Sequence, residues 1–141
     1  MRSILVLNTK GGSGKTTIAT TLASFYASIG KSVALVDLDS QESSISWLKL
    51  RSSAKPPITG IKGYGEKVRR GIDYKIIDAP AGLQGSALTK VLNMAESVII
   101  PVLPSPIDMR AAGEFIKNIK KHSRVVKKKS KVALVANRGR D

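Results

Sequence analysis

A glycine-rich loop lies near the start of the chain, between a short apolar run and a segment with helical spacing. Residues 3–7 read SILVL, residues 8–17 read NTKGGSGKTT, and apolar side chains recur through 16–29 before Gly30. A strand, a loop and a helix in this order bring backbone N–H groups and the positive end of a helix dipole to one point. The glycines leave that point open to an anion because they carry no side chain. The pattern predicts a phosphate-binding turn between a buried strand and a helix.

The end of this loop carries the side chains that phosphate chemistry needs. Lys15 is expected to neutralise β- and γ-phosphate charge, and Thr16 to offer a hydroxyl to Mg²⁺. Thr9 stands where the common pattern G-x-x-x-x-G-K-[ST] has its first glycine. The alternative is a plain glycine turn that joins a strand to a helix. The predicted phosphate-binding residues are Gly11, Gly12, Ser13, Gly14, Lys15, Thr16 and Thr17.

Strand and helix patterns alternate along the rest of the chain. Strands are predicted at 3–7, 32–36, 74–77, 97–103 and 131–136, and helices at 16–29, 44–50, 64–70, 86–95 and 106–123. Ser105 should be an N-cap with Pro106 at the first helical position, and Pro101 should lie at a sheet edge or near the end of its strand. Nearly continuous apolar strands separated by helices predict an α/β fold, with a twisted parallel sheet covered by helices on both faces.

Three carboxylates follow predicted strands. Asp37 and Asp39 come after the second strand, and Asp78 closes the run Ile76-Ile77. Ligands of parallel sheets bind at the carboxyl ends of the strands, where Asp78 can hold Mg²⁺ through water. Successive residues at a strand end project to opposite sides, and the two acids need not act alike. One is expected to orient the attacking water or to join the metal's outer shell; the alternative is a turn acid that caps the helix near Ser44.

The charge balance indicates an anionic partner. The 141 residues, which we expect to form one domain (1–141), include 24 Lys and Arg against 10 Asp and Glu, a net charge of +14. Nucleic acid, an acidic membrane surface or an acidic protein fits this excess, and improved solubility is the alternative. The chain has no cysteine, which excludes disulfides, thiolate zinc sites and iron–sulfur clusters. No apolar run approaches the roughly 20 residues of a membrane span, so we expect a soluble cytoplasmic protein.

Basic residues crowd one segment near the C-terminal end. Phe115, Ile116 and Ile119 should form the apolar face of this segment and leave the lysines outward. Phosphate neutralisation by such residues gives salt-sensitive binding without sequence preference, and a solvated face is the alternative. The segment carries Lys117, Lys120, Lys121, Arg124, Lys127, Lys128, Lys129 and Lys131, and a second patch is possible at Lys67, Arg69 and Arg70.

Five motifs in order along the chain resemble those of the ParA/MinD family. Residues 10–17, KGGSGKTT, resemble the deviant Walker A box KGGxGKTT. Residues 36–41, VDLDSQ, resemble the DLDPQ segment, with Ser40 in place of proline. Residues 76–82, IIDAPAG, are similar to IIDTPPG, and 100–106, IPVLPSP, to IPVxPS. Residues 136–138, ANR, are similar to the Asn-Arg pair after a later strand.

The resemblance implies roles for individual residues. It implies that Lys10 reaches across a dimer interface to the partner's ATP while Lys15 binds its own nucleotide. Asp39 would position or activate the water, and Asn137 would contact adenine. The implied catalytic residues are therefore Lys10, Lys15 and Asp39, and the implied magnesium site consists of Thr16, Asp39 and the Walker B acid Asp78.

The resemblance also implies a function. A ParA-like ATPase would form a homodimer with ATP and Mg²⁺, bind nonspecific double-stranded DNA on the nucleoid, and position a plasmid, a chromosome region or a protein cargo. A partner protein would stimulate hydrolysis and release. The alternatives are a MinD-like membrane-surface switch and a metabolic P-loop enzyme, and Lys10 argues against most kinases. Family members usually continue for one or two more strands and helices, which implies that the C-terminal part of the usual domain is absent.

Overall fold

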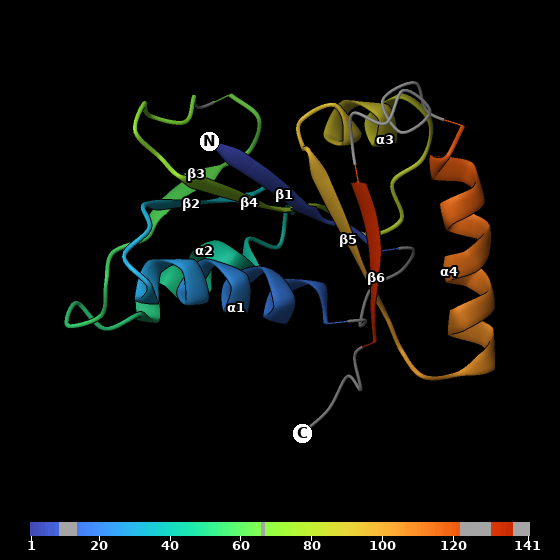
Figure 1. Cartoon of the computed structure of the whole chain (residues 1–141), viewed down its shortest axis with the longest axis horizontal. Helices are drawn as coiled ribbons and strands as arrows, with labels where there is room; N and C mark the ends of the chain where they lie inside the picture. Colours follow the sequence, from blue (N-terminus) through green and yellow to red (C-terminus); the bar gives the residue numbers. More distant parts are fainter. Residues whose placement is uncertain (9–13, 66, 122–130, 137–141) are drawn as a thin grey trace.

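A parallel sheet forms the centre of the computed structural model, which describes residues 1–8, 14–65, 67–121 and 131–136 (Figure 1). Within these residues the sheet has six strands in the order β3-β2-β4-β1-β5-β6, and every pair is parallel. The strands are β1 Arg2–Val6, β2 Val33–Asp37, β3 Thr59–Lys62, β4 Tyr74–Asp78, β5 Ser97–Val102 and β6 Lys131–Ala136. The predicted α/β fold with a parallel sheet is confirmed.

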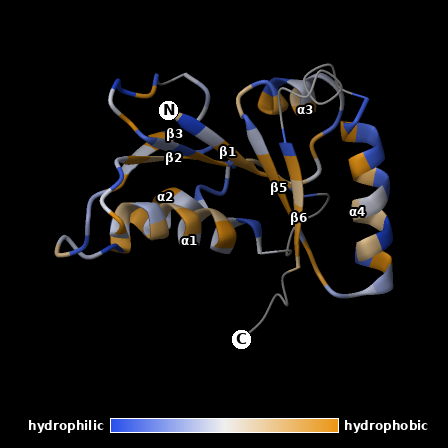
Figure 2. Ribbon diagram, viewed as in Figure 1, coloured by the Kyte–Doolittle hydropathy of each residue, from blue (hydrophilic) through white to orange (hydrophobic). Residues whose placement is uncertain are grey.

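Helices cover both faces of the sheet, because each central strand is apolar on both sides. Side chains on one face, such as Leu35 and Ile76, pack with α1 (Lys15–Ser28) and α2 (Ser43–Leu50). Side chains on the other, such as Ile77, pack with α3 (Gly85–Leu92) and α4 (Pro106–Ile119) (Figure 1). Figure 2 shows apolar residues along the strands and interspersed with polar residues on the helices. All five residues of β2 are buried, as expected for a strand covered on both faces.

One strand departs from the sequence-based expectation. β3 lies in and beyond the expected loop 52–59, and it pairs with β2 in parallel register, with Val36 opposite Ile61. Of its four residues only Ile61 is buried, so the sequence shows no apolar run there. A Cβ on Gly60 would lie 2.9 Å from Leu48 Cδ1, so this glycine lets α2 pack closely on the strand.

The helix predicted at 64–70 is wrong, because none of the described residues in that range is helical. Contacts with α3 and with the core determine the conformation of the described residues of 64–70 instead. Lys90 of α3 places its ammonium 4.0 Å from the ring centroid of Tyr64, and Val68 packs against the core. These contacts override the local helical pattern.

The start of α4 confirms the predicted cap. Ser105 Oγ accepts the backbone N–H of Asp108 at 3.1 Å, and a proline occupies the first turn. The helix ends at Ile119, earlier than the predicted residue 123. Pro101 is the penultimate residue of β5, beyond Ile99, where the register with β1 stops, so its predicted place near a strand end is confirmed. None of the described helices is long and apolar enough to cross a membrane.

Candidate nucleotide-binding site

Asp78 lies at the centre of the candidate site. It is the last residue of β4, which runs between β2 and β1, and its side chain is fully buried. Asp37 is its register partner on β2 and Val6 its register partner on β1. The strand order therefore brings the Asp37–Asp39 turn and the end of β1, which leads into the glycine-rich loop, to the two sides of Asp78.

The first turn of α1 supplies two partners to this carboxylate. The helix begins at Lys15, after Gly14 with φ 84°, a conformation that glycine adopts without strain. Lys15 Nζ contacts Asp78 Oδ1, and Thr16 Oγ1 donates to Asp78 Oδ2 at 3.0 Å. Only 7% of Lys15 is exposed, so this is a buried ion pair. A cation and a hydroxyl thus meet one carboxylate at the start of the helix.

Asp37 and Asp39 make different contacts, because Asp37 is the last residue of β2 and Asp39 lies in the turn beyond it. Asp37 is buried and accepts the backbone N–H groups of Asp39 and Ile45, each at 3.0 Å. It therefore holds the start of α2, which is the capping role considered for one of the two acids. Burial raises the pKa of Asp37, and these backbone N–H bonds oppose the rise.

Asp39 faces the lysine instead. Its Oδ2 lies 3.6 Å from Lys15 Nζ, and its Oδ1 accepts the N–H of Gln41 at 3.0 Å. The side chain keeps 22% exposure, so it can be reached from solvent. A partly exposed carboxylate beside the buried ion pair can contact a water molecule.

Several predicted site residues lie outside the described part of the chain: Lys10, Gly11, Gly12, Ser13 and Asn137. Their roles stay predictions. Thr17 is described and is exposed on α1, where its carbonyl accepts the hydroxyl of Thr20 at 3.1 Å.

The residues around Asp78 fit a magnesium ion that is shared with phosphate. Among the described residues no group of three or more acidic, histidine or cysteine side chains gathers as a metal site. Mg²⁺ does not require such a group, since it keeps several waters and takes one or two carboxylates together with substrate phosphates. The adjacent oxygens of Thr16 and Asp78 have this chemistry.

Ser44 is a site residue that sequence reasoning does not identify. It lies in the first turn of α2, is fully buried, and donates its hydroxyl to Asp78 Oδ2. The available signal is a hydroxyl residue a few positions after the acidic pair, at the start of a predicted helix. Such a signal is weak, because serine is common in helix first turns.

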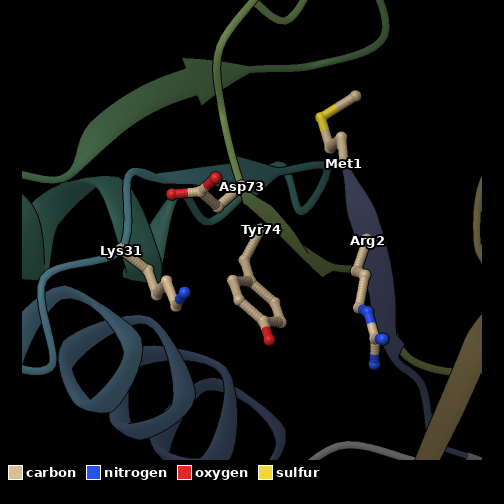
Figure 3. A pocket seen from close by; sticks show the side chains of 5 residues that line it. All are labelled: Met1, Arg2, Lys31, Asp73 and Tyr74. Carbon is tan, nitrogen blue, oxygen red and sulfur yellow. The ribbon is translucent and has the colours of Figure 1, made fainter.

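A cavity of about 410 Å³ lies at the opposite edge of the sheet. Figure 3 shows its lining residues, which lie at or just before the amino ends of β1, β2 and β4: Met1, Arg2, Lys31, Asp73 and Tyr74. Asp73 Oδ2 accepts the N–H of Ser32 at 2.9 Å and its hydroxyl at 3.0 Å. This cavity is therefore separate from the residues that meet at Asp78.

A family model and two curated relatives match most of the chain. Residues 4–141 match the model of the CobQ/CobB/MinD/ParA nucleotide binding domain. The chain is 31% identical over 147 residues to a "Maintenance of carboxysome distribution protein A" of Halothiobacillus neapolitanus, covering 96% of this chain and 65% of that protein. A protein of the same name from Gloeobacter kilaueensis is 33% identical over 126 residues, covering 82% of this chain and 55% of that protein. The chain thus spans between half and two-thirds of these relatives.

Solved structures share the fold at low sequence identity. A plasmid partition protein from Borrelia burgdorferi superposes with a TM-score of 0.75 at 19% identity, covering 96% of this chain and 77% of that one. The pNOB8 ParA bound to nonspecific DNA gives a TM-score of 0.69 at 20% identity, covering 85% of this chain and 60% of that one. The family model spans nearly the whole chain, and the chain therefore belongs to the CobQ/CobB/MinD/ParA family of nucleotide-binding domains.

Proposed function

We propose that this chain is a ParA-like ATPase that binds ATP with Mg²⁺ and uses nucleotide-dependent dimerisation to bind DNA and position a cargo. The observation that carries the proposal is the convergence of Lys15 and Thr16 on the buried carboxylate of Asp78, at the start of the helix that follows the glycine-rich loop. In P-loop ATPases a lysine, a hydroxyl and a carboxylate hold the phosphates and the metal.

The residues divide the chemistry between them. Lys15 would exchange its contact with Asp78 for the phosphates, whose negative charge its ammonium would stabilise. Thr16 and, through water, Asp78 would hold Mg²⁺, which would supply charge neutralisation at the phosphates. Asp39, whose Oδ2 lies 3.6 Å from Lys15 Nζ, would orient the attacking water or join the outer shell of the metal.

Dimerisation at this edge has two supports. The sequence places Lys10 in the glycine-rich loop, where the family resemblance gives it a role on the partner's ATP. Ile107 and Met109, in the first turn of α4, are 77% and 61% exposed. α4 begins after β5, so these apolar side chains lie toward the carboxyl edge of the sheet. Exposed apolar groups beside a nucleotide site suit a dimer interface.

Binding to DNA is supported by charge and by the side of α4 that faces solvent. Ile119 is buried, whereas Lys117, Lys120 and Lys121 are exposed. Lys67, Arg69 and Arg70 are exposed as well. Together with the net charge of +14, they favour phosphate contacts without sequence preference. The DNA complex of the pNOB8 relative supports the same reading by analogy, and binding would place the protein in the cytoplasm on the nucleoid.

The cargo is proposed from the relatives. The two curated relatives are named for maintaining carboxysome distribution and the structural neighbour for plasmid partition. A protein assembly, a plasmid or a chromosome region therefore suits this chain. A cargo-borne partner protein would stimulate hydrolysis and thereby release the DNA.

The test is binding to random-sequence duplex DNA with ATP, ADP or no nucleotide, at two salt concentrations. We expect ATP-dependent binding that weakens with salt and is lost in Lys10→Ala. Replacing Lys117, Lys120 and Lys121 by alanine should make the binding constant less dependent on salt. The slope of log K against log salt concentration should fall in magnitude by about one for each DNA phosphate that the protein no longer neutralises. Lys49→Ala, an exposed lysine of α2 on the other face of the sheet from α4, is the matched control and should bind like the wild type.

Two other results would change the proposal. DNA binding of equal strength with ATP, ADP and no nucleotide would mean that the basic surface binds DNA by electrostatic attraction alone. It would contradict the proposed control of DNA binding by the nucleotide. Failure to bind DNA, combined with ATP-dependent flotation on anionic vesicles, would favour the MinD-like membrane switch.

A further inference from the structure

Ser44 connects the candidate metal carboxylate to α2. Its hydroxyl donates to Asp78 Oδ2, the same oxygen that accepts Thr16 Oγ1 at 3.0 Å, while Lys15 meets Oδ1. Asp78 therefore has side-chain partners from two helices. Lys15 and Thr16 come from α1, and Ser44 comes from α2, which follows the Asp37–Asp39 turn directly.

The hydroxyl of Ser44 is not occupied in capping its own helix. Glu42, at the N-cap position of α2, makes no side-chain cap bond, and the N–H of Ile45 goes to Asp37 Oδ2 at 3.0 Å. Ser44 is fully buried, and a buried hydroxyl is costly unless it is hydrogen-bonded. Its position is thus explained by the bond to Asp78.

Binding of a magnesium nucleotide would change the set of partners of Asp78. Under the proposed function, on which this inference rests, Lys15 would move to the phosphates, and Thr16 would offer a lone pair of its hydroxyl to the metal. Ser44 would then remain the partner of the carboxylate that comes from α2. A hydrogen bond of this kind fixes the direction in which a carboxylate presents its oxygens to a metal.

We propose that Ser44 is a positioning residue: it orients Asp78 for Mg²⁺ and transmits the occupancy of the metal site to α2. Loss of such a partner typically weakens metal affinity about 10–100-fold. The dependence of nucleotide affinity on Mg²⁺ should therefore rely on Ser44, whereas affinity without the metal should not.

The chain contains its own reporter for the movement of α2. Trp47, its single tryptophan, lies on α2 less than one turn after Ser44 and packs against the core on that side of the sheet. The guanidinium of Arg51 lies 5.5 Å from the centroid of its ring. A shift of α2 would alter these contacts and with them the emission of Trp47.

The experiment compares ADP binding by calorimetry in Mg²⁺ and in EDTA, together with Trp47 emission. Ser44→Ala removes the hydroxyl, and Ser44→Cys keeps the size with a weaker donor. Ser46→Ala, an exposed serine on the same helix, is the matched control. Far-UV circular dichroism shows whether each variant keeps its helices.

We expect all variants to bind ADP equally in EDTA. In Mg²⁺, Ser44→Ala should bind ADP about tenfold more weakly than the wild type, Ser44→Cys should be weakened in the same direction, and the Trp47 response should shrink in both. Ser46→Ala should match the wild type. The inference would be overturned if Mg²⁺ raised the ADP affinity of Ser44→Ala as much as that of the wild type and the change in Trp47 emission were also the same. A wild type that binds no ADP would overturn the proposed nucleotide site itself.

Discussion

Asp37 Oδ2 accepts the backbone N–H of Ile45 at 3.0 Å, across the turn between β2 and α2. Its Oδ1 accepts the N–H of Asp39 at 3.0 Å. The buried carboxylate therefore fixes both the turn that presents Asp39 and the start of the helix that carries Ser44.

Asp37→Ala is expected to destabilise the fold. The substitution leaves two backbone donors without their acceptor, and each such loss costs about 1–3 kcal/mol. We predict that the free energy of unfolding falls by about 2–4 kcal/mol in urea denaturation. A loss similar to that of the exposed control Ser46→Ala would contradict the capping role of Asp37.

Lys15→Ala is expected to lower stability as well as nucleotide binding. Lys15 and Asp78 are 7% and 0% exposed, so the variant leaves a buried carboxylate without its cation. Breaking a buried pair in this way costs about 3–5 kcal/mol. The double variant Lys15→Ala with Asp78→Asn removes the stranded charge and should recover part of the loss. Urea denaturation in the absence of nucleotide measures both, and a double variant no more stable than Lys15→Ala would contradict the explanation.

Glu42 has φ 53°, a left-handed conformation that is unfavourable for a side chain with a Cβ. It also pairs with Lys62 at 3.2 Å, but both side chains are about half exposed, so this ion pair contributes little. Glu42→Ala keeps the strain and loses the pair, whereas Glu42→Gly relieves the strain. We predict that the glycine variant is more stable than the alanine variant by about 1 kcal/mol in thermal or urea unfolding. The reverse order would show that the turn is not strained at this position.

Asp73 provides a prediction on pH. Hydrogen bonds from the N–H and hydroxyl of Ser32 hold the pKa of Asp73 below its usual value of 3.8, against a smaller opposing effect of burial. Between the folded pKa and pH 3.8 the folded state therefore binds fewer protons than the unfolded state. The contribution of Asp73 to the free energy of unfolding is complete above pH 3.8 and is lost as the pH falls through the folded pKa. The stability advantage of wild type over Asp73→Asn should therefore shrink on acidification. Carboxyl NMR titration gives the pKa directly, and a value at or above 3.8 would contradict the prediction.

The local features of this protein follow from the sequence. The apolar runs predict five of the six described strands, and the Ser105-Pro106 start predicts the beginning of α4. Lys15 and Thr16 stand at a helix start because a glycine turn and helical spacing come together there. Each of these signals acts over a few neighbouring residues, so no distant interaction is needed to read it.

The tertiary structure decided which residues meet. β3 was not predicted because it has one buried residue and depends on pairing with β2. The described residues of 64–70 are not helical, because Tyr64 and Val68 contact residues of α3 and of the core that are distant in sequence. The order β2-β4-β1 placed Asp78 between the two loops of the site. The sequence alone determined the chemistry available at each strand end. The division of roles between Asp37 and Asp39, and the bond of Ser44 to Asp78, were decided by packing between segments up to 34 residues apart, which local pattern does not encode.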